Sequence, residues 1–170
     1  MIGEDNSIDF LEIWDDYSSE EKTPPKPVRR ILKKREVRDG MIRPGVKGNL
    51  VAAQTLIKKE RYKEALIRLE RVLTEDPDQR EALFRSALVR KHLGMLDEAL
   101  RALNRLIELE PDFAGLRYER GACHFEMKNW DQAMEEFEVY VHLAGDNPDE
   151  KRFVKKALKL HAEARKKYSS

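Results

Sequence analysis

The sequence predicts an all-α fold, an α-solenoid of stacked helix-turn-helix repeats with an extended N-terminal tail. The first observation is a period of 34 residues that separates Ala65, Ala99 and Ala133, with similar bulky residues around each alanine. The second is the composition: charged residues make up 38% and hydrophobic residues 41% of the chain, which is typical of amphipathic helices with solvated outer faces. A fixed period of this length indicates helix hairpins that pack only on their neighbours.

Residues 1–27 form an acidic tail, which we expect to be largely disordered or to take up structure only with a partner. Residues 1–22 hold eight carboxylates against one lysine, and three prolines in 23–27 favour an extended backbone. Within 7–17, large apolar side chains interrupt the acidic residues, and anchors of this kind often fold onto a partner. The anchors are Phe10, Leu11, Ile13, Trp14 and Tyr17. The tail can dock on another protein, pack on the protein's own repeats, or bind at the basic end of their groove.

Residues 28–45 are expected to form a short basic helix over 28–38 and a linker. Its lysines and arginines would neutralise phosphates, which suggests nucleic acid as a ligand. The segment has no aromatic residue for base stacking, however, and Ile31, Leu32 and Val37 make a small apolar face that can pack on the first repeat. We therefore regard nucleic-acid binding as unlikely.

Three repeats are predicted at 46–79, 80–113 and 114–147. The helix pairs expected within them are 46–59 with 62–75, 80–93 with 96–109, and 114–127 with 130–143. Small residues recur in the first helices, bulky residues follow each periodic alanine by four positions, and prolines end the first two repeats. These are, in turn, Ala53, Ala87 and Gly121; Leu69, Leu103 and Phe137; and Pro77 and Pro111. The third repeat has Gly145 in place of the proline.

Residues 148–170 are predicted to form a basic helix that caps the array. Its apolar positions share one stripe, with Lys and Arg opposite: Phe153, Val154, Ala157, Leu158, His161 and Ala164.

The register of the three repeats resembles the tetratricopeptide repeat (TPR) family. The starts of the second helices carry the resemblance best: Tyr62-Lys63-Glu64-Ala65, Leu96-Asp97-Glu98-Ala99 and Trp130-Asp131-Gln132-Ala133. It covers about residues 46–147. It implies a protein-binding module in which the first helices line a concave groove.

The family register also assigns the groove positions expected to bind a peptide or helix of a partner. They are Lys47, Leu50, Gln54, Lys58, Phe84, Arg85, Leu88, Lys91, His92, Tyr118, Glu119 and Phe125. Bases gather at one end of this set, while Glu119 and Glu126 stand at the other, so a partner segment with an acidic, aromatic end would find complementary potential. Some of the apolar members can instead belong to the core.

One known activity of the family finds no match. Members that hold the C-terminal carboxylate of heat-shock chaperones use a clamp of Lys and Asn on the first groove helix, Asn on the second, and Lys with Arg on the third. The corresponding residues here are Leu50 and Gln54, then Arg85, then Gly115 and Glu119. A clamp of that kind is therefore not expected.

Catalytic and cofactor motifs are not found. The four histidines are scattered without zinc-ligand spacing, and neither a phosphate loop nor a dinucleotide fingerprint occurs. The single cysteine, Cys123, is expected to fill the core. No run of eighteen apolar residues could span a membrane, and the acidic N-terminus does not resemble a secretory signal.

We therefore expect a non-catalytic adaptor or scaffold of the cytoplasm, without cofactor or metal, that binds a protein partner within a larger assembly. In the alternative, residues 7–17 bind the partner and the repeats present them. In both cases the protein can also self-associate, with the tail of one copy in the groove of another.

Overall fold

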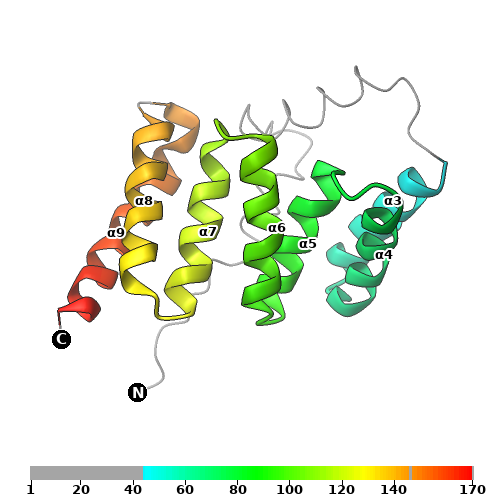
Figure 1. Ribbon diagram of the computed structural model, residues 1–170, viewed down its shortest axis with the longest axis horizontal. Helices are drawn as coiled ribbons and strands as arrows, with labels where there is room; N and C mark the ends of the chain where they lie inside the picture. Colours follow the sequence, from blue (N-terminus) through cyan, green and yellow to red (C-terminus); the bar gives the residue numbers. More distant parts are fainter. Residues whose placement is uncertain (1–43, 146, 170) are drawn as a thin grey trace.

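The computed structural model describes residues 44–145 and 147–169, which form seven α-helices and one 3₁₀ helix and contain no strand. The helices are α3 (Pro44–Lys58), α4 (Tyr62–Glu75), α5 (Arg80–His92), α6 (Leu96–Leu109), α7 (Ala114–Glu126), α8 (Trp130–Ala144), η1 (Pro148–Glu150) and α9 (Lys151–Tyr168). Figure 1 shows them in one array, from α3 at one end to α9 at the other. The all-α prediction is confirmed. The predicted tail and the basic segment 28–38 lie outside the described residues.

Each of the six repeat helices begins and ends within two residues of its predicted bounds. Pro44 starts α3 two residues early, because a proline at the first helical position loses no hydrogen bond. None of the described helices is long and apolar enough to cross a bilayer.

The same turn closes each hairpin and again follows the 34-residue period. Glu60, Gly94 and Lys128 have positive φ angles of 57°, 74° and 62°. The next backbone N–H reaches back five residues: Arg61 donates to Leu56, Met95 to Arg90, and Asn129 to His124, at 2.8–2.9 Å. This is the Schellman motif, in which the left-handed position favours glycine. Only one of the three repeats has glycine there.

The core consists of three apolar clusters, each shared by one hairpin and the first helix of the next. One joins α3 and α4 to α5. The second joins α5 and α6 to the start and middle of α7. The third joins α7 and α8 to α9. Since the buried residues of each cluster come from one hairpin and the segment up to the end of the next helix, the array holds together mainly through contacts between neighbours.

The third hairpin is closely packed at its small-residue position, Gly121. A Cβ atom on Gly121 would lie 2.9 and 3.0 Å from two ring atoms of Phe137 and 3.1 Å from the Cβ of Glu136. The corresponding residues of the first two repeats are Ala53 and Ala87, which face a leucine rather than a phenylalanine. The glycine thus accommodates the larger ring.

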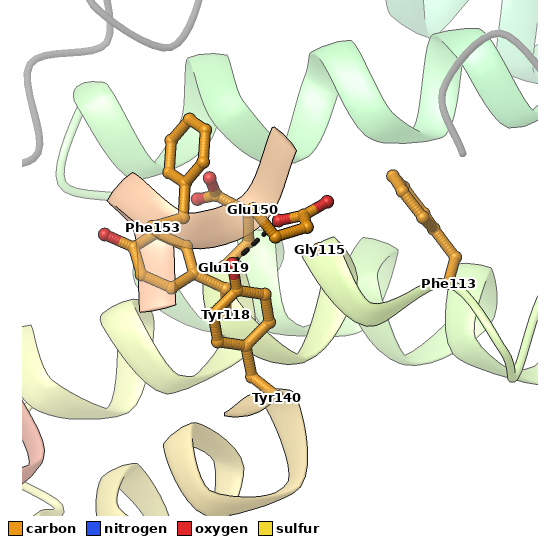
Figure 2. Close-up of a pocket in the computed structure, with 7 residues that line it drawn as sticks. All are labelled: Phe113, Gly115, Tyr118, Glu119, Tyr140, Glu150 and Phe153. Carbon is orange, nitrogen blue, oxygen red and sulfur yellow. Dashed lines mark hydrogen bonds between the residues drawn. The ribbon is translucent and has the colours of Figure 1, made fainter. Parts of the chain in front are cut away.

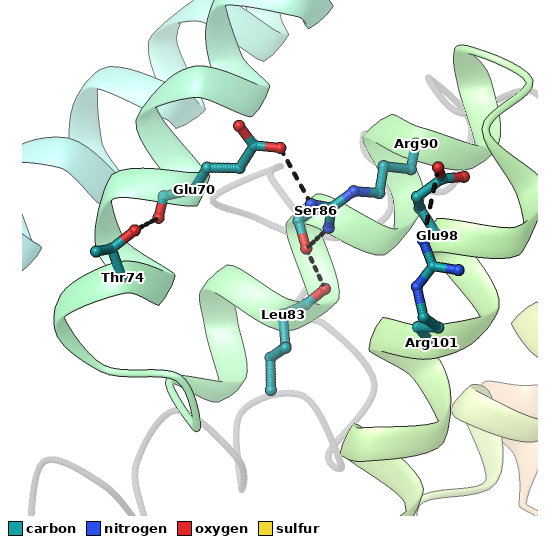
Figure 3. A network of polar contacts seen from close by, with 7 residues as sticks. All are labelled: Glu70, Thr74, Leu83, Ser86, Arg90, Glu98 and Arg101. Atoms are coloured by element: carbon teal, nitrogen blue, oxygen red, sulfur yellow. Dashed lines mark hydrogen bonds and ion pairs between the residues drawn. The ribbon is translucent and has the colours of Figure 1, made fainter.

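Polar side chains connect successive repeats at the surface. At the first junction, Arg90 of α5 donates to Ser86 (2.9 Å) and to Glu70 of α4 (3.2 Å), as Figure 3 shows. At the second junction, Arg120 of α7 donates to Asn104 of α6 (2.9 Å) and pairs with Glu136.

The terminal helix α9 packs mainly on α8. The prediction that Leu158 belongs to its buried apolar stripe was wrong. Leu158 is 53% exposed, whereas Leu160 is buried with Ala157 and Ala164. The buried side of α9 is therefore rotated about the helix axis relative to the predicted stripe. Before it, the side chain of Asn147 accepts a hydrogen bond from the Asp149 N–H (3.1 Å) and starts the 3₁₀ helix.

Candidate partner-binding face

The predicted groove positions lie on α3, α5 and α7, and we call the surface they share with η1 and α9 the first-helix face. On α3, Lys47 and Lys58 are exposed and Gln54 is half-buried. Leu50 is only 7% exposed and belongs to the core cluster of the first hairpin. Its side chain is therefore a core element.

On α5, Leu88 is also a core residue, at 2% exposure. Phe84 and Arg85 are half-buried, and Phe84 contacts the ring of Phe113 at a centroid distance of 6.3 Å. His92 is exposed, and its ring centroid lies 4.1 Å from that of Tyr62.

On α7, Tyr118 and Glu119 are buried, and half-buried Phe125 packs edge-on against Trp130 of α8. Partner binding at all twelve predicted positions remains a prediction.

A buried ion pair connects two of these helices. The Lys91 Nζ lies 2.5 Å from the Glu119 Oε2, and the two side chains are 6% and 5% exposed. Burial by itself would lower the pKa of Lys91, but the charge and hydrogen bond of Glu119 outweigh it and raise the pKa above its ordinary value. Lys91 therefore stays charged and is neutralised by Glu119.

This pairing changes the expected charge pattern of the face. Lys91 and Glu119 were placed at opposite ends of the groove, yet they cancel each other. Arg85 likewise pairs with Glu81 of its own helix, at 2.6 Å. The positive potential expected along α5 is therefore much weaker than the sequence suggests.

A partly open pocket lies where α7, α8 and η1 meet the start of α9 (Figure 2). Its walls combine four aromatic rings with two carboxylates and one glycine: Phe113, Gly115, Tyr118, Glu119, Tyr140, Glu150 and Phe153. The ring of Tyr118 stands edge-on to those of Tyr140 (5.2 Å) and Phe153 (6.1 Å). The Tyr140 hydroxyl donates to the Glu150 Oε2 at 2.7 Å.

Most of the pocket was not predicted as a site. Tyr140 lies on a second helix, and Glu150 and Phe153 follow the three predicted repeats. One signal was available: Phe153 comes 34 residues after the predicted groove residue Glu119. Extending the period one step further would have found it.

Cys123 lies under this face and is fully buried. Burial raises the pKa of its thiol to about 12. Over the described ranges 44–145 and 147–169, no group of three or more His, Cys, Asp or Glu side chains is placed to hold a metal ion.

Two family models, both described as tetratricopeptide repeat, match this chain at residues 56–112 and 95–158. Among sequence relatives, Hsp70-Hsp90 organizing protein 3 of Arabidopsis thaliana is 32% identical over 81 residues, which is 48% of this chain and 14% of the relative. Human tetratricopeptide repeat protein 13 is 33% identical over 84 residues, covering 49% of this chain and 10% of the relative. The chain thus corresponds to a small part of each relative.

Solved structures share the fold at low sequence identity. The type III secretion chaperone SycD of Yersinia enterocolitica, in complex with a peptide of the translocator YopD, superposes with a TM-score of 0.69 and 11% identity; the match covers 75% of this chain and 97% of SycD. The TPR2B domain of yeast Sti1, in a complex with pHsp70, gives 0.64 and 14%, over 72% and 97% of the two chains.

Proposed function

Because the chain belongs to the tetratricopeptide-repeat family, we propose that it is a non-catalytic adaptor that binds a segment of a partner protein on the first-helix face, within a larger assembly of the cytoplasm. Two structural neighbours are complexes with other proteins or their segments: SycD with a peptide of YopD, and the Sti1 domain with pHsp70. The SycD complex supports a peptide as the ligand class.

The pocket between α7, α8 and η1 is the observation that carries the proposal. Two predicted groove positions, Tyr118 and Glu119, converge on it, and aromatic rings supply most of the remaining wall. The cavity is small, about 10 Å³, which is room for about one water-sized group, so it can hold the tip of one side chain while the rest of the segment lies on the surrounding face. One anchoring side chain in such a pocket can carry much of the affinity of an interface.

The ligand differs from the carboxylate tails bound by the family's clamp. The residue at the last clamp position, Glu119, is itself a carboxylate and is already paired with Lys91. The residue at the first, Leu50, is buried in the core. A C-terminal carboxylate would therefore meet neither the lysine nor the arginine of the clamp at these two positions.

Filling the pocket tests the proposal. Gly115→Met places a flexible side chain in the wall, where the three atoms nearest to a new Cβ belong to the Phe113 ring, at 3.3–3.9 Å. Gly48→Met on α3 is the matched control, because nothing lies within 4 Å of its Cβ position. Both changes replace a helical glycine and gain helix propensity, but at Gly115 the Phe113 ring must also shift by a few tenths of an ångström, so thermal melts of both variants accompany the binding measurement.

Peptides are first selected from a displayed random library on the full-length protein, and their affinities are then measured by isothermal titration calorimetry. We expect Gly115→Met to weaken binding at least tenfold and Gly48→Met to leave it unchanged. Equal affinities for the two variants would refute the pocket as the binding site. Loss of cellular partners with Trp14→Ala, but not with Gly115→Met, would favour the alternative in which the tail binds.

A further inference from the structure

We propose that this pocket takes the charged tip of a cationic side chain, lysine or arginine, from the bound segment, with the methylenes of that side chain lying at the open mouth of the pocket. The inference rests on the proposed function and specifies the chemistry of its anchor. The sequence led us to expect that an acidic end of the partner binds at the basic end of the groove; the inference adds a cationic anchor at the opposite end, beside Glu119.

Glu150 is the first reason. Its side chain belongs to the pocket wall, the residue is only 5% exposed, and its hydrogen-bond donor is the neutral hydroxyl of Tyr140. No lysine, arginine or histidine of the described residues lies within ion-pair distance of it. A carboxylate removed from water without a cation is costly, whereas one that meets a cation on binding is compensated.

Glu119 adds a second acceptor. Its Oε2 is bound by Lys91, while its Oε1 has no hydrogen-bond donor within residues 44–145 and 147–169. The Oε1 of Glu150 is in the same situation. Two carboxylates and one lysine leave the pocket with one uncompensated negative charge.

The aromatic walls suit the rest of such a side chain. The methylenes of lysine or arginine pack on rings while the charged end reaches a polar group. A cation near the face of an aromatic ring is also attracted to it. The rings of Phe113 and Phe153 stand on opposite sides of the two carboxylates in Figure 2, so a side chain that enters between them meets both features.

Two other ligands fit less well. Calcium prefers six or more oxygen ligands, and magnesium prefers near-ideal octahedral geometry. The pocket offers only the two carboxylates of Glu119 and Glu150 as charged ligands. An acidic side chain would meet these carboxylates in a buried setting. The lysines and arginines of α9 are exposed except for the half-buried Lys156, so water and salt screen most of their repulsion of a cation.

Three small probes of similar size test the inference on the full-length protein: N-acetyl-arginine amide, N-acetyl-lysine amide and N-acetyl-norleucine amide. Binding is followed by NMR through the ring signals of Tyr140 and Phe153. A hydrogen bond to a charged group corresponds to roughly tenfold to hundredfold in affinity, so the two cationic probes should bind at least tenfold more tightly than norleucine.

Glu150→Gln removes the charge but keeps an oxygen that can accept from Tyr140. It should abolish the preference for the cationic probes, whereas Glu135→Gln, at an exposed position of α8, should leave the preference intact. An equal response to all three probes, a preference that survives in Glu150→Gln, or no shift with any probe would each overturn the inference. Peptide selection with Gly115→Met decides the proposed function separately.

Discussion

The close packing at Gly121 makes a sharp prediction, because one chemical change should have opposite effects at two glycines. Gly48→Ala has open space around the new methyl group and gains helix propensity, about 1 kcal/mol. Gly121→Ala gains the same propensity, but its methyl group would lie 2.9–3.1 Å from Phe137 and Glu136. Phe137 is fully buried and cannot move aside freely.

Overpacking of this kind costs about 1–3 kcal/mol. With three contacts at or near 3 Å, we take the upper half of that range, so the net loss for Gly121→Ala is about 1–2 kcal/mol. Gly48→Ala should gain about 1 kcal/mol. For a chain of this size, 1 kcal/mol shifts the melting temperature by about 2–4 °C. Urea unfolding followed by circular dichroism, with thermal melts alongside, measures both variants.

A double-mutant cycle tests the stated cause. Phe137→Leu recreates the alanine–leucine pairing of the first two repeats, so it should relieve the strain of Gly121→Ala. We expect a favourable coupling free energy of about 1–2 kcal/mol between the two substitutions. If Gly121→Ala stabilises the protein as much as Gly48→Ala, or if the coupling is zero, the packing argument is refuted.

Three further predictions concern turns, the buried ion pair and the thiol. Glu60→Gly should stabilise the protein by about 1 kcal/mol and Gly94→Ala should destabilise it by about 1–2 kcal/mol, because both positions are left-handed; urea titration distinguishes the signs. Glu119→Gln should cost about 3 kcal/mol by leaving a buried lysine without its partner, and adding Lys91→Met should recover most of the loss; a larger loss in the double variant would contradict this. The folded chain keeps the Cys123 thiol protonated up to a pKa of about 12, while the unfolded chain loses the proton above about 8.5. Stability should therefore fall by about 1.4 kcal/mol per pH unit above about 8.5, and Cys123→Val should flatten this slope between pH 8.5 and 10 in unfolding titrations.

The helix bounds could be predicted because the 34-residue period repeats the apolar pattern three times, so each repeat supports the assignment of the others. α9 had no such support. Leu158 and Leu160 lie on different sides of one helix, and only the position of α8 decides which is buried. The left-handed turn positions of the first and third repeats could not be predicted from the sequence, because Glu60 and Lys128 lack the preference for positive φ that glycine has at Gly94.

The candidate site was less predictable than the fold. Register correctly indicated which helices share a face, but it does not report which side chains meet. Lys91 and Glu119 are 28 residues apart and were assigned to different ends of the groove, whereas they form one ion pair. Glu150 and Phe153 follow the recognised repeats. Their placement beside Tyr118 depends on how α9 returns against α8.

The division of the core among neighbouring helices has a mechanical consequence. A pulling force applied at α3 would not need to break all contacts together, because the buried residues of the first-hairpin cluster come from no helix beyond α5. Each 34-residue unit that unravels adds about 115 Å of contour length. The pocket lies between α7 and α9, so the first such step would leave it intact. A repeat array built in this way can lengthen under load at its α3 end while the pocket between α7 and α9 stays folded.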